Sequence, residues 1–321
     1  MIVIFSYPNE VNTNKIIEWL VRFNCTFKRI HLEEEDFRNI TLKLNKEKCK
    51  ICLDLKDGSQ LDFDTVSYFL YRGGRFPENY SSDATSILPK ELMNLHLEIE
   101  YKGLVEFFYQ EVRKKCIGWI SNLLLNKIYQ LNLARSLGIT IPNSIIVNTD
   151  TEDLTDHFIT KGIQESVVFQ TEELLYLQRV HKIDKKTLSG VFFPSLFQEI
   201  VNKKFEIRSF YLEGNFYSIA VLNESNDKNI DTRANTDSNI NIPYQLPIEL
   251  EQKLRALMHQ LNLVSGSIDL LCDENGEFYF LEVNPEGQYD WVSVFGNYQL
   301  HKKIAHFLAT QNQVFYETEK S

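Results

Sequence analysis

The sequence predicts a mixed α/β (α+β) protein with more than one domain. With 321 residues, 43 % of them hydrophobic, the chain can bury two or three compact cores rather than one. Strand and helix patterns alternate over residues 1–32, as in a doubly wound parallel sheet. Later segments resemble strand pairs joined by tight turns, a pattern typical of antiparallel sheet.

The N-terminal pattern predicts a strand at residues 1–7, an amphipathic helix at 11–24 and a strand at 25–32. Because no GxGxxG motif follows the first strand, dinucleotide binding is unsupported. A strand pair turns at Asp57-Gly58, and the next strand ends at Arg72. Since charged residues at carboxyl ends of strands in open sheets commonly face the ligand crevice, Arg72 is a candidate substrate contact.

Helical sequence follows from about residue 88 to 115, and a second amphipathic helix begins near residue 122, with Gly138 at its C-cap. We then expect a strand at 144–148, a short helix, and two further strand segments up to residue 184. A hairpin turning at Glu213-Gly214 leads into a polar loop at residues 223–245, which its Asn, Asp and Ser content predicts to be a mobile segment or a lid. A helix at about 247–261 precedes the last hairpin.

That hairpin, GSIDLLCDENGEFYFLEVNPEGQ (266–288), is the most informative segment. Glu282 and Asn284 are two apart on one strand and share a face, and Asp269 can join them across an Asn-Gly turn. Three oxygen ligands and no soft atom predict a magnesium site that leaves positions for phosphate oxygens. The alternative is a solvated acidic surface, but Glu282 lies among apolar neighbours, where a carboxylate without a partner is costly to bury.

Composition excludes several classes of function. A net charge of −10 and a pI near 5.3 argue against nucleic-acid binding. No apolar run approaches 18 residues, which predicts no membrane span, and the N-terminus lacks the basic lead of a signal peptide. Five scattered cysteines predict a reduced, cytoplasmic protein, and the Cys49/Cys52 pair would place its thiols on opposite faces of a strand.

Further candidates are weak one by one. Lys161 is the sole charge in FITKGI and could bind an anion, or its stem could reach solvent. Lys127 is flanked by apolar residues and is a further candidate for anion binding. The alternative interpretation is again a lysine whose side chain reaches solvent. Glu206 and Arg208 share a strand face and could meet ribose and phosphate, or form an ordinary cross-strand ion pair. The loop residues Asp231-x-Arg233-x-Asn235 could bind a phosphate or a carboxylate through the arginine. Alternatively, they form an ordinary solvated loop.

Taken in order, these features resemble the ATP-grasp superfamily over about two thirds of the chain. Within it, the LYRGG, IPYQLP and NPEGQ segments resemble the grasp-with-spasm peptide maturases and the microviridin-type, graspetide-forming ligases. The motifs that carry the superfamily resemblance are NKIYQLNLARSLGITIP, ITKGI, LFQEIV, FEIR, DTRAN, SGSIDL and LEVNPEGQ.

The resemblance implies an ATP-grasp fold with an N-terminal Rossmann-like pre-ATP-grasp domain (1–95), a central domain (96–190) and a C-terminal ATP-binding domain (191–321). It also implies a role for each candidate residue. Lys127 and Lys161 would contact ATP phosphates. Arg208 and Arg233, with Asn235 nearby, would neutralise the transferring phosphate. The remaining implied contacts are the Gln198-Glu199-Ile200 backbone with adenine, Glu206 with ribose, and Asp269, Glu282 and Asn284 with one or two Mg²⁺.

The implied function is an ATP-dependent ligase that phosphorylates Asp or Glu side chains of a ribosomal precursor peptide and forms ω-ester or ω-amide crosslinks with Ser, Thr or Lys. No covalent enzyme nucleophile is needed, in agreement with the lack of a Ser-His or Cys-His pattern in the sequence. The implied partners are the precursor peptide, a SPASM-domain protein and a second copy in a homodimer. Two alternatives stay open: a ligase of small amino acids or protein tails, and a nucleotide-binding module without turnover.

Overall fold

The computed structural model forms two compact units, Met1–Leu123 with Gln299–Ser321 (unit 1) and Leu124–Tyr298 (unit 2). The structure describes residues 1–34, 39–76, 89–121, 125–164, 168–170, 175–177, 180–188, 190–223 and 239–318. This division differs from the expected boundaries at residues 95 and 190. Residue 95 lies inside one continuous helix, and the C-terminal helix returns to the first unit.

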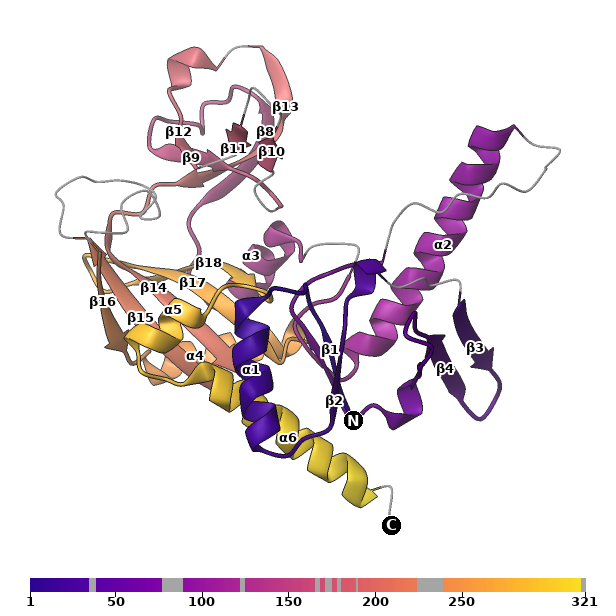
Figure 1. Ribbon diagram of the computed structural model, residues 1–321. Coiled ribbons are helices and arrows are strands. Elements are labelled where there is room, and N and C mark those ends of the chain that lie inside the picture. Colours follow the sequence, from indigo (N-terminus) through magenta and orange to yellow (C-terminus); the bar gives the residue numbers. More distant parts are fainter. Residues whose placement is uncertain are drawn as a thin grey trace. The chain divides into compact units, whose positions relative to one another are not determined.

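Unit 1 is built on a parallel sheet with strand order β2-β1-β6-β7 (Figure 1), which confirms the expected βαβ opening. Val3 and Phe5 alternate with Ile2 and Ile4 along β1, so the strand is buried on both faces, as in doubly wound sheets. The strands are β1 (Ile2–Phe5), β2 (Phe27–Ile30), β6 (Tyr68–Tyr71) and β7 (Cys116–Ile117), and the helices are α1 (Val11–Arg22), α2 (Lys90–Arg113) and α6 (Leu300–Thr318).

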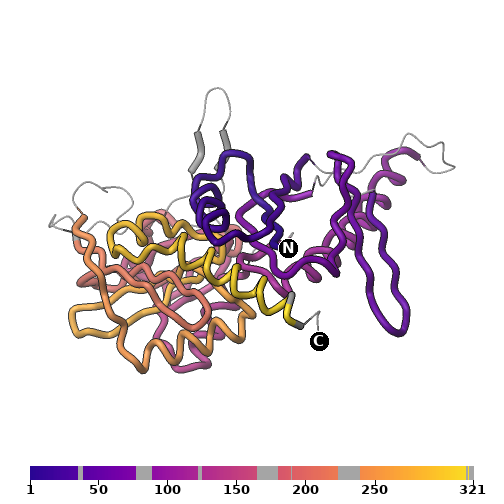
Figure 2. Tube along the Cα trace, turned by 60° about the horizontal axis from the view of Figure 1, so that its bottom comes forward, coloured from indigo at the N-terminus to yellow at the C-terminus, as the bar shows by residue number. Residues whose placement is uncertain are grey.

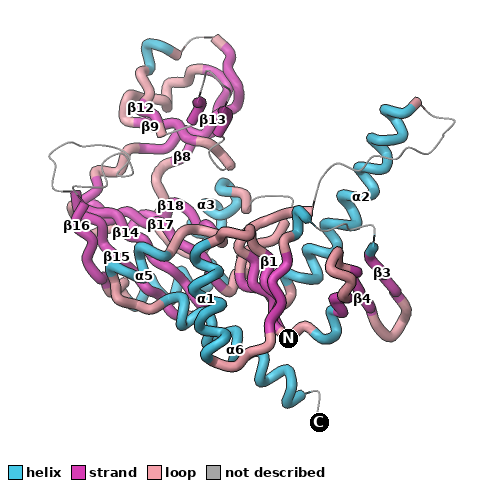
Figure 3. The backbone as a smooth tube through the Cα atoms, viewed as in Figure 1, coloured by secondary structure: helices cyan, strands magenta, loops and turns pink. Residues whose placement is uncertain are grey.

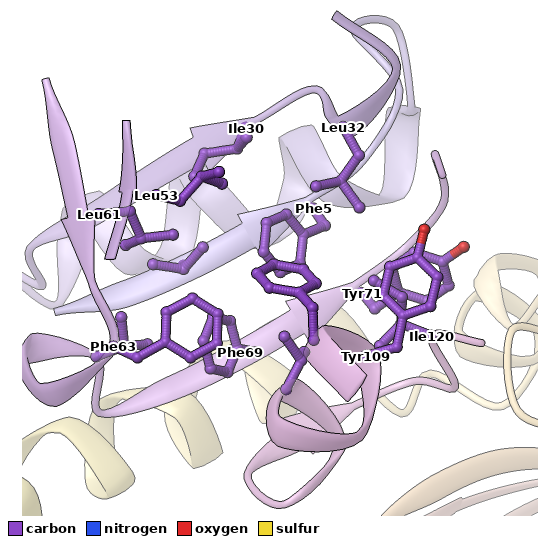
Figure 4. Packing of buried hydrophobic residues seen from close by; sticks show 14 of the residues in the cluster. Phe5, Ile30, Leu32, Leu53, Leu61, Phe63, Phe69, Tyr71, Tyr109 and Ile120 are labelled. Atoms are coloured by element: carbon purple, nitrogen blue, oxygen red, sulfur yellow. The ribbon is translucent and has the colours of Figure 1, made fainter. Parts of the chain in front are cut away.

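Aromatic side chains fill the core between the parallel sheet and α2 (Figure 4). The rings of Phe5 and Phe69 stack with centroids 5.6 Å apart, and Phe63 packs against Phe69 at 5.2 Å. On α2, Phe108 packs against Phe5 and Phe63. Helix α6 packs against α1, so residues from the two ends of the chain complete unit 1.

A three-stranded antiparallel sheet extends unit 1 (Figure 2). Its strands are β3 (Ile40–Leu44), β4 (Cys49–Asp54) and β5 (Gln60–Asp62). The expected turn at Asp57-Gly58 joins β4 to β5, with Gly58 at φ +80°, whereas the sequence analysis did not foresee β3. Cys52 is buried and Cys49 is partly exposed, and both thiols are free.

Unit 2 contains two larger sheets and a short hairpin of β10 (Val168–Gln170) and β11 (Leu175–Leu177). The first sheet has the order β12-β9-β13-β8, with strands β8 (Ser144–Thr149), β9 (Phe158–Lys161), β12 (His181–Lys182) and β13 (Val191–Glu199). The second has the order β16-β15-β14-β17-β18, with strands β14 (Lys203–Leu212), β15 (Asn215–Asn223), β16 (Asn239–Tyr244), β17 (Ser265–Asp273) and β18 (Phe278–Asn284).

Three helices support the five-stranded sheet (Figure 3). Helix α3 (Lys127–Ser136) packs against β18 and against α4 (Ile248–Gln260), and α5 (Asp290–Phe295) packs against β14, β15 and β16. The Asn126 side chain caps α3, and Gly138 follows its end at φ +71°, as the sequence predicted. Within the described parts of the chain, no helix combines the length and apolar character needed to cross a bilayer.

Two expected elements of unit 2 are wrong. Residues 150–157 form turns where a short helix was expected. The end of the supposed polar loop, residues 239–244, is the edge strand β16, which pairs with β15. Its Asn-Ile-Asn-Ile sequence alternates with period two, so Ile side chains share one face and Asn side chains the other. Residues 224–238, with Asp231, Arg233 and Asn235, lie outside the described residues.

Candidate active site

Three adjacent strands bring the predicted acidic residues together. Arg208 on β14 is opposite Asp269 on β17, and Asp269 is opposite Glu282 on β18. We call Arg208, Asp269 and Glu282 the charged row. The Asn275-Gly276 turn closes the hairpin, with Gly276 at φ +84°, which confirms the turn that the sequence predicted.

Each carboxylate of the charged row is paired with a cation. Arg208 forms an ion pair with Asp269, and both side chains are largely buried, at 20 % and 13 % exposure. Lys127, the first residue of α3, places Nζ 2.7 Å from Glu282 Oε2 and 3.4 Å from the Gly162 carbonyl oxygen. The helix and the hairpin therefore form one charged centre, although 155 positions of sequence separate Lys127 from Glu282.

Asn284 continues the same face of β18. Its Oδ1 accepts a hydrogen bond of 2.9 Å from the Glu286 amide, which fixes the side chain and leaves a second lone pair on that oxygen. Among the described residues, no three His, Cys, Asp or Glu side chains gather closely enough to hold a metal ion. Two carboxylates and one amide oxygen nevertheless suit a hard cation such as Mg²⁺, which keeps other positions for water and phosphate.

Glu206 and Arg208 share a face of β14, as expected. Glu206 is 8 % exposed and its Oε1 lies 2.5 Å from Lys203 Nζ, while its Oε2 lies 3.7 Å from Arg208 Nη2. A buried carboxylate held by two cations has a fixed orientation, so Glu206 is well placed to accept hydrogen bonds from a polar ligand. Lys161 ends β9, where it is opposite Leu196 of β13, and its side chain is half-buried.

The segment predicted to bind adenine uses its amides within the protein. The Glu199 amide donates to the Asn143 carbonyl and the Ile200 amide donates to the His157 carbonyl, at 2.9 and 2.7 Å. The Gln198 side chain is buried and donates to Ser144 Oγ. A nucleotide base would therefore have to use carbonyl oxygens here, or the next two residues, Val201 and Asn202, which the sequence analysis did not select.

A cavity of about 230 Å³ lies beside this segment, lined by residues 199–202 and by the turn of the last hairpin. Tyr279 closes one side of it. Burial, with the nearby carboxylates of Asp273, Glu277 and Glu199, raises the pKa of the Tyr279 phenol. Tyr279 therefore lines the cavity as an uncharged side chain.

A larger cavity of about 640 Å³ lies over the charged row. Sequence reasoning missed much of its wall, including Ser267, Gln288 and Trp291, and the amides of Asn239 and Asn241 on β16. At the start of α5, the Tyr289 ring packs on Phe210 with centroids 4.6 Å apart. The sequence offered a signal only for Trp291, a large aromatic residue just after the NPEGQ segment.

Gln130 links α3 to strand β18 of the last hairpin. It is 2 % exposed, its Oε1 accepts a 2.6 Å hydrogen bond from the Val283 amide, and its Nε2 donates to the Leu125 carbonyl. Gln130 and Lys127 are three apart and lie on one side of the helix. The amide therefore fixes the same turn of α3 that carries the partner of Glu282.

Gly287 is required for packing at the end of this hairpin. A Cβ atom there would lie 2.6 Å from Ser267 Cβ and 3.2 Å from the Asn284 carbonyl oxygen. We expect Gly287→Ala to lower the stability of unit 2 by about 1–3 kcal/mol, because β17 and β18 must separate. Thermal unfolding measures this loss, and Gly287→Ala combined with Ser267→Gly should regain most of it. Equal losses in the single and double variants would contradict the contact.

Arg72 belongs to unit 1, where it follows β6 and its amide donates to the Phe5 carbonyl at 2.8 Å. It lies at the carboxyl end of a strand, as the sequence predicted. The structure therefore brings together Lys127, Arg208, Asp269 and Glu282 within unit 2, with Arg72 in the other unit.

Comparisons with known proteins agree with this architecture at the level of the fold. No protein-family model and no curated protein sequence matches the chain. A RiPP-associated ATP-grasp ligase from Chryseobacterium gregarium, solved with ADP and a leader and core peptide, superimposes with a TM-score of 0.74 and 19 % identity, covering 97 % of this chain and 96 % of that one.

Two other solved structures show how far the fold extends. The ATP-grasp ligase PsnB, complexed with minimal precursor, Mg and ADP, has a TM-score of 0.66 at 14 % identity, over 97 % of this chain and 98 % of that one. D-alanine–D-alanine ligase from Bacillus anthracis has a TM-score of 0.53 at 14 % identity, over 100 % and 98 %. The chain therefore has the ATP-grasp fold.

Proposed function

We propose that the protein is an ATP-dependent ligase that joins Asp or Glu side chains of a ribosomally made precursor peptide to Ser or Thr hydroxyls or Lys amines. The charged row is the observation that carries this proposal, because its two carboxylates and the cations paired with them, Arg208 and Lys127, suit a metal-bound polyphosphate. The Chryseobacterium gregarium ligase, solved with ADP and a leader and core peptide, supports the choice of substrate.

In the proposed reaction, a carboxylate oxygen of the peptide attacks the γ-phosphorus of ATP, the bond to the bridging oxygen breaks, and ADP leaves. The resulting acyl phosphate is attacked by the hydroxyl or amine, which loses its proton as inorganic phosphate departs. Each crosslink therefore removes one water from the peptide. Catalysis rests on alignment and on neutralising charge, because no enzyme nucleophile takes part.

Asp269, Glu282 and Asn284 would hold Mg²⁺, which when bound neutralises charge on the phosphates. PsnB, solved with Mg and ADP, supports this assignment. Arg208 and Lys127 now pair with the two carboxylates. With metal and nucleotide bound, these two cations would pair with phosphate oxygens instead, so the site would exchange one set of charge pairs for another without leaving a buried charge unpaired.

The remaining nucleotide contacts would come from β14, β13 and β9. Glu206 would accept hydrogen bonds from the ribose, the carbonyl groups of Gln198-Glu199-Ile200 would meet the adenine, and Lys161 would contact a phosphate. Arg233 and Asn235 would neutralise the acyl phosphate, and Arg72 would contact the peptide. We further infer a homodimer, a SPASM-domain partner and a cytoplasmic location, the last supported by five free cysteines.

A small amino acid is the second candidate substrate, favoured by the full-length match to D-alanine–D-alanine ligase. ADP release with free amino acids and no peptide would support this second candidate.

Intact mass measurement tests the peptide proposal. The purified protein is incubated with ATP, Mg²⁺ and the peptide encoded beside its gene, and we expect losses of about 18 Da per crosslink. A reaction without ATP is the control and should leave the mass unchanged. An unchanged mass in the complete reaction, with ADP formed from amino acids alone, would contradict the peptide proposal.

A further inference from the structure

The Ser267 hydroxyl is a buried polar group with no hydrogen-bond partner in the described part of the chain. Its oxygen is shielded from solvent and makes no hydrogen bond with any residue that the structure describes. The residue itself lines the cavity of about 640 Å³ over the charged row. Buried hydroxyls normally find a partner, so an unpaired one beside a cavity needs an explanation.

Ser267 occupies a definite place relative to the charged row. Cross-strand neighbours form three successive rows over the sheet: Glu206 with Leu271, then Arg208 with Asp269 and Glu282, then Phe210 with Ser267 and Asn284. On β17, the residues at 267, 269 and 271 are more exposed than those between them, so they share the cavity face. Successive rows are about 7 Å apart.

The order of the rows matches the order of groups in phosphoryl transfer. Under the proposed function, Glu206 meets the ribose and the charged row meets the metal and the terminal phosphates. In-line transfer places the attacking oxygen on the far side of the γ-phosphorus from the leaving ADP. Ser267 lies in the row on that side, where the substrate carboxylate has to approach.

The packing around Ser267 leaves its hydroxyl free to turn. Phe210, its neighbour on β14, is apolar and covered by the Tyr289 ring. On the other side, Gly287 has no side chain where a Cβ would lie 2.8 Å from Ser267 Oγ. The hydroxyl is therefore tucked beside Gly287, and rotation about χ1 to another staggered position turns it toward the cavity.

We infer that Ser267 is a substrate-contacting residue whose hydroxyl donates a hydrogen bond to an oxygen of the carboxylate that becomes phosphorylated. This inference rests on the proposed ligase function. The hydroxyl holds the carboxylate in line with the γ-phosphorus, and the substrate supplies the partner that the ligand-free site lacks. Apolar Phe210 leaves Ser267 and Asn284 as the polar groups of this row, and Asn284 is assigned to the metal.

Ser267→Ala distinguishes a substrate-binding role from a structural one. A structural role predicts a lower melting temperature for the variant, and a substrate-binding role predicts an unchanged or higher one. Removing an unpaired buried hydroxyl should leave the melting temperature of the ligand-free protein unchanged or raise it by about 2 °C. The rate of mass loss of the neighbouring-gene peptide, as kcat/KM for the peptide, should fall by about 10- to 100-fold. The KM for ATP should stay the same, because the nucleotide lies over the other two rows.

Ser218→Ala is the matched control. Ser218 is also buried on this sheet, but its hydroxyl donates to Ser209 Oγ at 2.7 Å, so its loss should lower the melting temperature and leave peptide turnover unchanged. Ser267→Cys replaces the hydroxyl with a somewhat larger and weaker donor and should be as slow as the alanine variant.

The outcomes distinguish this inference from the proposed function. If the wild-type chain forms no crosslink, the ligase proposal fails and the role of Ser267 fails with it. If the wild type is active and Ser267→Ala forms crosslinks at the same rate, only the role of Ser267 is overturned. A lower melting temperature for Ser267→Ala, with peptide turnover reduced in proportion to the folded fraction, would also overturn it in favour of a structural role.

Discussion

Replacing Glu282 with glutamine is expected to abolish crosslink formation, with a fall in kcat of at least about 1000-fold. The amide keeps the size of the side chain but removes the charge that would hold Mg²⁺. Lys127 also loses its partner at 2.7 Å, so a cation with 15 % side-chain exposure is left without compensation. Such a loss in rate corresponds to about 4 kcal/mol of transition-state stabilisation.

The measurement is the initial rate of mass loss of the precursor peptide, with the melting temperature recorded with and without MgADP. MgADP should raise the melting temperature of the wild type and have little effect on Glu282→Gln. Asp269→Asn should behave in the same way, because Asp269 is the other carboxylate of the charged row. Glu249→Gln, on the exposed first turn of α4, is the control, because it removes the same charge at a surface position outside the charged row. Retention of Mg²⁺-dependent turnover by Glu282→Gln would contradict the metal assignment.

Replacing Gln130 with leucine is expected to lower the stability of unit 2 by about 2–4 kcal/mol. The Val283 amide, on the edge strand β18, would lose its Gln130 Oε1 acceptor at 2.6 Å and be left facing an apolar group. Crosslinking should also slow by about tenfold, because the helix turn that carries Lys127 is no longer held against Glu282.

In thermal unfolding, the melting temperature of Gln130→Leu should be about 4–10 °C below that of the wild type. Asn132→Ala, on the exposed side of the same helix, should leave both the melting temperature and the rate near the wild-type values. Gln130→Glu keeps an acceptor for the Val283 amide but loses the donor to the Leu125 carbonyl. Its melting temperature should therefore lie between those of the wild type and Gln130→Leu. A Gln130→Leu protein with wild-type stability would show that the bridge is dispensable.

Elements set by local signals were predictable from the sequence. The hairpin turns at Asp57-Gly58 and Asn275-Gly276 place a glycine at positive φ, which glycine adopts without steric cost. Helix α3 ends before Gly138 for the same reason. Strand β16 was missed because its short apolar alternation lies directly after a long polar segment, and an edge strand has a partner on one side alone.

The sequence predicted most residue types of the candidate site, but it did not predict which of them contact each other. Asp269, Glu282 and Asn284 could be grouped because strand alternation and one turn place them on a single face. Lys127 was a candidate without a partner, because only tertiary packing brings the start of α3 to Glu282. Gln130 and Ser267 had no local signal of function, since a polar side chain has the same sequence pattern whether it supports a sheet or lines a cavity.

The sequence by itself determined the mixed α/β class, the order of most strands and helices, and the face of the hairpin that carries the acidic residues. These properties depend on backbone preference and on the periodicity of side chains along a few neighbouring positions. Tertiary structure alone decided that α6 returns to unit 1, that Arg208 meets Asp269, and that the Ser267 hydroxyl is buried with no partner among the described residues. Each of these depends on the register and packing of segments far apart in the chain, which local preference does not encode.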